Sequence, residues 1–178
     1  MKKTLLIITL ALGFMSMTLI DETPTRIIPG IGIEGYVTVN ATTSGAVKTK
    51  FGTDYKEVNH YITTGGSKSL YSVEHLYKKQ GVSFYFRPNK DTVFAIHFFP
   101  AYKGKTDKNI VCGVSTMQDV INAYGNVEWA YTDNEMSLDY SGIAFIIPFS
   151  GKFPVPESVQ TAALTKKVAE IAVRGFEQ

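Results

Sequence analysis

The chain has 178 residues, of which 44% are hydrophobic and 19% charged, so it can bury a core and lacks the composition of a disordered protein. Its formal net charge is only +2 and no dense lysine and arginine run occurs, which excludes the electrostatic footprint of a nucleic-acid-binding protein. Because Cys112 is the single cysteine, an intramolecular disulfide is also excluded.

The amino terminus has the pattern of a secretory signal peptide. A short positive region at residues 1–3 precedes an apolar segment at residues 4–20. The apolar segment is also close to the minimum length of a membrane span. We therefore expect residues 1–20 to be a signal peptide or an N-terminal anchor, and the protein to be periplasmic or extracellular. Any contact with a membrane is expected through this segment alone. Residues 21–29 are predicted to be a linker.

The folded part is predicted to begin with a glycine-punctuated strand at residues 30–39. Thr42 is the expected N-cap of a short helix that Gly52 ends. The segment at residues 55–67 follows this helix and contains glycines beside tyrosine and histidine. Three alternating or aromatic-rich segments then predict an antiparallel meander, at residues 71–77, 82–86 and 92–99.

The second helix has the clearer pattern. Met117, Val120, Ile121 and Tyr124 recur at helical spacing and form one apolar stripe. Ser115 is the expected N-cap, Gln118 is placed to close a capping box, and Gly125 is the expected stop. Strands are predicted after it, at residues 127–131, 136–140, 143–149 and 168–173. Residues 158–167 are predicted to form a short helix or an extended loop.

The two helical segments correspond to one another. Thr42, Val47, Phe51 and Gly52 match Ser115, Val120, Tyr124 and Gly125 at one constant offset, and Gly81–Phe84 matches Gly142–Phe145. We therefore predict an α+β fold made of two tandem copies of a short-helix plus antiparallel β-meander unit. The copies are placed at residues 30–104 and 105–178. Because no parallel crossover is evident, the helices are expected on one side of an antiparallel sheet.

The helix-opening motif also resembles that of a known family. Gly113-Val114-Ser115-Thr116, leading into a helix that ends at Gly125, is similar to the motif of the beta-lactamase inhibitory protein family and of the small lipoproteins of outer-membrane barrel assembly. The resemblance implies a tandem α+β fold. It implies no partner, since this chain lacks the disulfides of the inhibitors and the lipidated cysteine of the lipoproteins.

No constellation of residues predicts catalysis. His60, His75 and His97 lack the spacing of a helical metal site, and no nucleophile elbow occurs. Cys112 lies in an apolar segment and is expected to pack as a small hydrophobe. We therefore expect no catalytic residue, no metal site and no cofactor, and we do not expect an enzyme.

Aromatic residues after each helix predict a binding surface instead. Tyr55, His60 and Tyr61 follow the first helix, and Trp129 and Tyr131 follow the second. Packing against the helix is the alternative interpretation of the last two residues.

We therefore expect an exported, non-enzymatic binding module that recognises a protein or cell-envelope component as an inhibitor or an assembly factor. The alternative is a small hydrolase or small-ligand carrier with a pocket between the two repeats and His60, His75 or His97 in it. A concave aromatic surface without a buried polar cluster favours the module. Two or more titratable groups that converge in a cleft favour the alternative.

Overall fold

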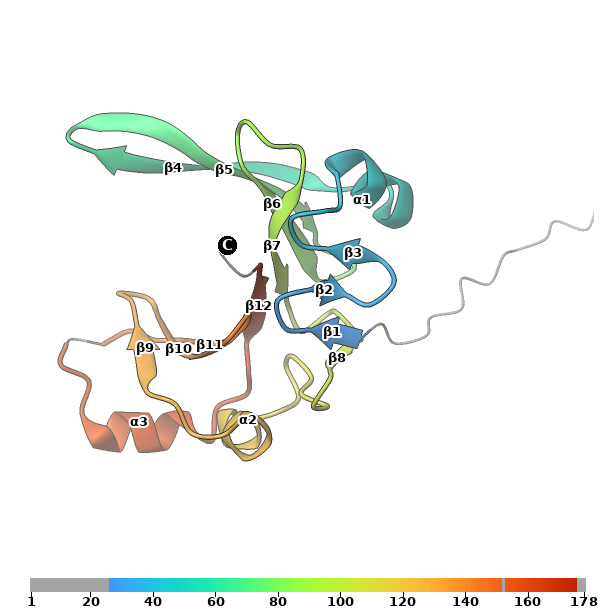
Figure 1. The fold of residues 1–178 in the computed structure, drawn as a ribbon. Coiled ribbons are helices and arrows are strands. Elements are labelled where there is room, and N and C mark those ends of the chain that lie inside the picture. Colours follow the sequence, from blue (N-terminus) through green and yellow to red (C-terminus); the bar gives the residue numbers. More distant parts are fainter. Residues whose placement is uncertain (1–25, 152, 176–178) are drawn as a thin grey trace, which may run out of the picture.

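The computed structural model describes residues 26–151 and 153–175, so the signal peptide or anchor predicted at residues 1–20 lies outside its range. The protein is α+β, with short helices on one side of an antiparallel sheet (Figure 1). The main sheet has eight strands in the order β4-β5-β6-β7-β12-β11-β10-β9. Their bounds are β4 Lys56–Thr64, β5 Ser67–Tyr77, β6 Val82–Phe86, β7 Val93–Phe98, β9 Trp129–Tyr131, β10 Glu135–Tyr140, β11 Ile143–Pro148 and β12 Glu170–Arg174. Within the described ranges, no helix combines the length and hydropathy of a membrane span.

The same order of elements occurs twice along the chain. Helix α1 (Ser44–Phe51) precedes β4 to β7, and helix α2 (Met117–Tyr124) precedes β9 to β12. Strands β7 and β12 pair antiparallel at the centre, so the two halves share one continuous sheet. The second half differs by helix α3 (Glu157–Ala163), which lies between β11 and β12.

A smaller, four-stranded sheet lies beside the main one, in the order β3-β2-β1-β8 (Figure 1). Its bounds are β1 Arg26–Ile28, β2 Gly32–Ile33, β3 Val37–Thr38 and β8 Lys105–Thr106. The strand predicted at residues 30–39 is therefore two short strands joined by a turn. Part of the linker predicted at residues 21–29 is β1, because buried Ile27 anchors it to the core. Strand β1 also pairs parallel with β8, a contact that the sequence did not predict.

The helices begin one residue later than predicted, for the same reason in both halves. The hydroxyls of Thr42 and Ser115 accept hydrogen bonds from backbone amides four residues earlier, at 2.8 and 3.1 Å, and hold the preceding turn. The next residue, Thr43 or Thr116, is then the N-cap. In α2 the capping box is closed by Asp119 and not by Gln118.

The helix ends are also fastened in the same way. Each helix ends at the predicted glycine, Gly52 or Gly125. A tyrosine from the second strand of the same half donates to that glycine's carbonyl, Tyr77 at 3.0 Å and Tyr140 at 2.6 Å. Phe84, at ring-centroid distances of 4.8 and 5.7 Å, packs between Phe51 and Tyr77. The corresponding trio of the second half is Tyr124, Tyr140 and Phe145.

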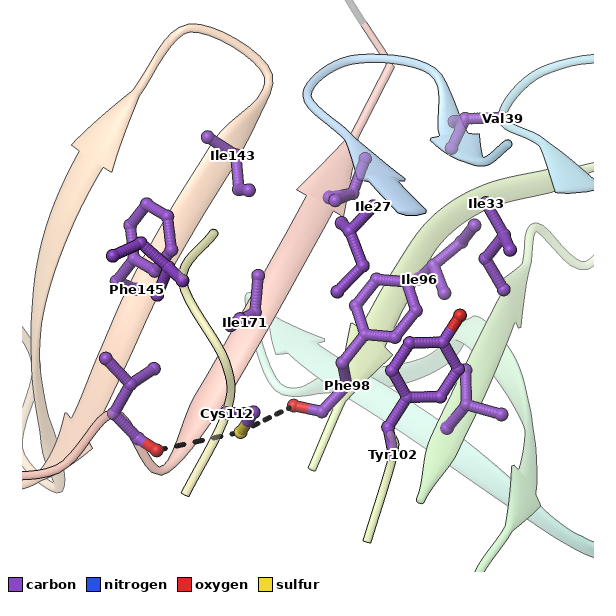
Figure 2. Close-up of a cluster of buried hydrophobic side chains, with 14 of the residues drawn as sticks. Ile27, Ile33, Val39, Ile96, Phe98, Tyr102, Cys112, Ile143, Phe145 and Ile171 are labelled. Atoms are coloured by element: carbon purple, nitrogen blue, oxygen red, sulfur yellow. Dashed lines mark hydrogen bonds between the residues drawn. The ribbon is translucent and has the colours of Figure 1, made fainter. Parts of the chain in front are cut away.

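One hydrophobic core lies between the helix side of the main sheet and the smaller sheet. Figure 2 shows Ile27 and Ile33 of the small sheet facing Ile96 and Phe98 of β7, with Ile171 of β12 alongside. The cluster contains residues of both halves, so the halves stabilise each other by burying apolar surface together.

Cys112 belongs to this core, as its apolar segment predicts. It is 2% exposed, and its Sγ lies 3.4 and 3.6 Å from the carbonyl oxygens of Phe98 and Val168 (Figure 2). Burial raises the pKa of the Cys112 thiol to about 12, so the thiol stays protonated at neutral pH and is a poor nucleophile.

Candidate binding site on the open face of the sheet

The second face of the main sheet is the open face: no described helix packs on it (Figure 1). Its buried apolar cluster consists only of Ala144, Ile146 and Ala172. Cross-strand pairing places the residues of this face in rows. One row is Glu74, Tyr85, Ala95 and Arg174, and the next is Ser83, His97, Ala172 and Ala144.

A hollow of about 1070 Å³ lies over these rows. It draws on β4, β5, β6, β7 and β12, and thus on both halves of the chain, although most of its lining comes from the first half. The lining residues are Asn40, His60, Tyr71, Ser72, Tyr85, Arg87, Lys90, Thr92, Phe94, Ala95, His97, Arg174 and Gly175.

Two histidine–carboxylate pairs converge at the hollow. His60 Nε2 lies 2.7 Å from Glu74 Oε2, and the other oxygen of buried Glu74 accepts a 2.6 Å hydrogen bond from the Ser83 hydroxyl. His97 Nδ1 pairs with a Glu170 oxygen. Both glutamates are therefore already occupied by partners within the protein.

Tyr85 lies between the two histidines. Its ring centroid is 4.4 Å from that of His97 and 5.7 Å from that of His60. Burial raises the pKa of Tyr85, and the nearby carboxylates of Glu74 and Glu170 add to this effect. The phenol therefore stays neutral at physiological pH and is a polar but uncharged part of the hollow.

The lining of the hollow is cationic. Arg87, Lys90 and Arg174 contribute to it, and within residues 26–151 and 153–175 no aspartate or glutamate lines it. The Arg87 guanidinium carbon lies 4.5 Å from the ring centroid of Phe94 and 5.4 Å from that of Tyr71. These cation–π contacts restrict the orientation of the Arg87 side chain.

An arm, defined as residues 61–71 of the β4–β5 hairpin, extends beyond the body of the sheet (Figure 1). It exposes four large apolar side chains: Tyr61 by 50%, Ile62 by 46%, Leu70 by 37% and Tyr71 by 40%. A β-bulge occurs here, because Tyr61 pairs with Leu70 while His60 pairs with Ser72. Tyr71 is the extra residue, and it lines the hollow.

The structure does not bring the five predicted binding residues together. His60 lies in the hollow and Tyr61 on the arm beside it. Tyr55 stacks on His75 at 4.2 Å on the helix side of the sheet. Trp129 and Tyr131 are half-buried on β9, at the opposite edge of the sheet, where both pack against the core.

Sequence reasoning missed most of the hollow. The sequence points to His97 only through the alternative hypothesis, and it does not point to Tyr85, Arg87 or Arg174. The alternation of side chains in β6 and β7 could have indicated part of the hollow. Since Phe84 and Phe98 are buried on one face of the sheet, the alternation places Tyr85 and His97 on the other face. The pairing of β12 with β7, which adds Arg174, has no comparable sequence signal.

Among the described residues, the hollow shows no side-chain nucleophile paired with a histidine. The Ser83 hydroxyl is fully buried and donates to Glu74, so it is not an accessible nucleophile. Among the described residues, no serine, threonine or cysteine side chain hydrogen-bonds to His60 or His97. The same residues contain no group of three or more side chains that could hold a metal ion.

Comparisons with known proteins add little. No family model matches the chain, and no curated protein is significantly similar to it. One solved structure is similar, described as the uncharacterized protein yfeY from Escherichia coli. It is 18% identical, with a TM-score of 0.48, and the match covers 84% of this chain and 99% of that one.

Proposed function

We propose that the protein is an exported, non-enzymatic binding module that holds a protein partner against its arm and open sheet face. The N-terminal sequence supports export, and the arm supports the binding of a protein. The five residues predicted at first are replaced in this proposal by a surface around His60 and Tyr61, because Tyr55, Trp129 and Tyr131 lie elsewhere.

The observation that carries the proposal is the exposure of Tyr61, Ile62, Leu70 and Tyr71 on one two-stranded ribbon. Two strands alone are marginally stable in water. Exposed apolar side chains that gather on one element mark interaction surfaces, and Tyr61 and Leu70 are direct cross-strand neighbours. Strand β4 is also the edge of the main sheet, so its outward backbone groups can pair with another strand. A partner that covers the arm would bury the exposed apolar side chains and pair with the free backbone groups of β4.

A second candidate is a carrier for a small ligand. The specific observation in its favour is the convergence of two histidines, their carboxylates and Tyr85 at the hollow, which is the feature expected of the alternative hypothesis. A volume of about 1070 Å³ is slightly larger than the usual range of ligand pockets, about 300–1,000 Å³. The hollow is continuous with the arm through Tyr71, which favours a large partner over a small one.

The proposal is tested with a partner captured by the full chain from an envelope extract, identified and then purified. Its affinity is measured for the wild type and for a Tyr61→Ser, Leu70→Ser double variant. We expect the variant to bind at least about 30-fold more weakly, because exposed aromatic and aliphatic anchors carry most interface energy.

The control is a Val114→Ser, Val159→Ser double variant, which removes two apolar side chains, 65% and 37% exposed, away from the arm. This control should keep the wild-type affinity, and both variants should keep the wild-type melting temperature. Equal affinities for the two double variants would refute docking on the arm.

A further inference from the structure

The hollow beside the arm has the charge of an acid-binding site. Three full cations line it, Arg87, Lys90 and Arg174, and no carboxylate of the described residues is part of the lining. Glu74 and Glu170 lie near them, but each is paired with a histidine and Glu74 also with the Ser83 hydroxyl. The three cations outnumber these two carboxylates, and among the described residues neither glutamate forms an ion pair with Arg87, Lys90 or Arg174. The cations are therefore left for an external group.

Arg87 is oriented for that role. Its guanidinium lies against the rings of Phe94 and Tyr71, at 4.5 and 5.4 Å, so its side chain loses little further freedom when a ligand binds. A guanidinium fork held in this way can donate two parallel hydrogen bonds to one carboxylate. Tyr85, half-buried between the two histidine rings, adds apolar surface beside the cations.

The hollow and the arm form one surface. Tyr71 lines the hollow and is also one of the four exposed apolar residues of the arm, and His60 lies in the same strand as Tyr61. A segment that covers the apolar arm therefore continues directly over the cations. Because the apolar arm lies next to the cationic hollow, this surface fits a partner in which apolar residues lie next to acidic ones.

We propose that the hollow binds the carboxylates of an acidic segment of the partner protein, with Arg87 and Arg174 as the principal contacts. This inference rests on the proposed function, because the segment belongs to the partner that docks on the arm. Charge complementarity selects an acidic segment. The volume of about 1070 Å³ has room for several side chains rather than one.

The test uses the full chain and two capped peptides, hexaglutamate and hexaglutamine, with binding measured by calorimetry at low ionic strength. We expect hexaglutamate to bind at least about tenfold more tightly, because hydrogen bonds to charged groups are stronger than neutral ones. Arg87→Gln and Arg174→Gln should each weaken hexaglutamate binding about tenfold, and Arg87→Lys should weaken it as well because the fork is lost.

The matched control is Lys166→Gln, which removes the same charge from an exposed loop after α3 and should leave binding unchanged. Equal binding of the two peptides, or equal loss in Lys166→Gln and the arginine variants, would overturn the inference. Glutarate and inorganic phosphate are measured in parallel. Tighter binding of either anion than of hexaglutamate would also overturn it, in favour of a small-anion carrier.

The arm variant separates this inference from the proposed function. If Tyr61→Ser with Leu70→Ser loses the partner while the two peptides bind alike, docking on the arm stands and the acidic segment is refuted. If hexaglutamate binds as expected but the arm variant keeps full affinity for the partner, the hollow binds acids from another source, which refutes the inference as stated.

Discussion

The two halves of the molecule share their order of elements and differ in their outer strands. In the first half β4 and β5 have 9 and 11 residues, whereas in the second half β9 and β10 have 3 and 6. The extra length of the first half forms the arm, and the second half has α3 instead. The shared parts hold the fold, and the unequal parts give the first half the arm on which we propose that a partner docks.

The halves also differ at one buried position. His75 pairs with Phe84 across β5 and β6, and Leu138 pairs with Phe145 across β10 and β11. Leu138 is fully buried, whereas the Nδ1 of His75 is buried without a hydrogen-bond partner among the described residues. The first half therefore contains a polar group in its core where the second half contains an apolar one.

The largest effect is expected from truncating the matched phenylalanines. Phe84→Ala and Phe145→Ala should each lower the free energy of unfolding by about 3–5 kcal/mol, because each leaves a cavity in the core. Since one core spans both halves, each variant should still unfold in a single transition. The measurement is urea unfolding, followed both by circular dichroism and by the fluorescence of Trp129. Trp129 is the single tryptophan of the chain and lies in the second half, so its fluorescence reports on that half. A fluorescence transition that shifts in Phe145→Ala but not in Phe84→Ala would show that the halves unfold separately.

A smaller effect on the free energy of unfolding is expected from His75→Leu. This substitution gives the first half a leucine at the position where the second half has Leu138. Desolvation lowers the pKa of His75 below its ordinary value of 6.5. Above pH 6.5 this shift has no effect on stability. As the pH falls below 6.5, the unfolded chain takes up a proton that the folded chain does not, so stability declines. His75→Leu should raise the free energy of unfolding at neutral pH by about 1 kcal/mol and reduce its loss in acid. A stability profile with the same slope in wild type and variant between pH 7 and mildly acidic pH would contradict this account.

The smallest effect is expected at the helix N-caps. Thr116 takes part in a capping box with Asp119, whereas Thr43 accepts a single hydrogen bond from the amide of Ala46. Thr116→Ala should lower the free energy of unfolding by about 1 kcal/mol, and Thr43→Ala should lower it by about half as much. Serine in place of either threonine should restore stability. A larger loss for Thr43→Ala would contradict the difference between the caps.

The helices were predictable because their signals are local. The stripe of α2 and the glycine stops at Gly52 and Gly125 depend on residues within two turns. The cap residue was off by one, because each half offers two adjacent hydroxyls, as at Thr42 and Thr43. Which hydroxyl caps the helix depends on the preceding turn, and that turn is set by tertiary contacts.

Strand β4 and the hollow were harder to predict. The segment at residues 55–67 is polar and exposed along most of its length, so it lacks the alternation of a half-buried strand. The hollow depends on register across five strands, and a pairing such as Ala95 with Arg174 joins residues far apart in sequence. Single-sequence patterns contain little information on such pairs, so they predict neither Arg174 nor Tyr85 as part of a site.

Hydrogen–deuterium exchange of the full chain, free and bound to its purified partner, tests the central claim most directly. The account predicts that protection on binding concentrates in the backbone amides of β4 and the arm, residues 56–71, and at β12 next to the hollow. Protection concentrated in β9 and β10, at the opposite edge of the sheet, would contradict it.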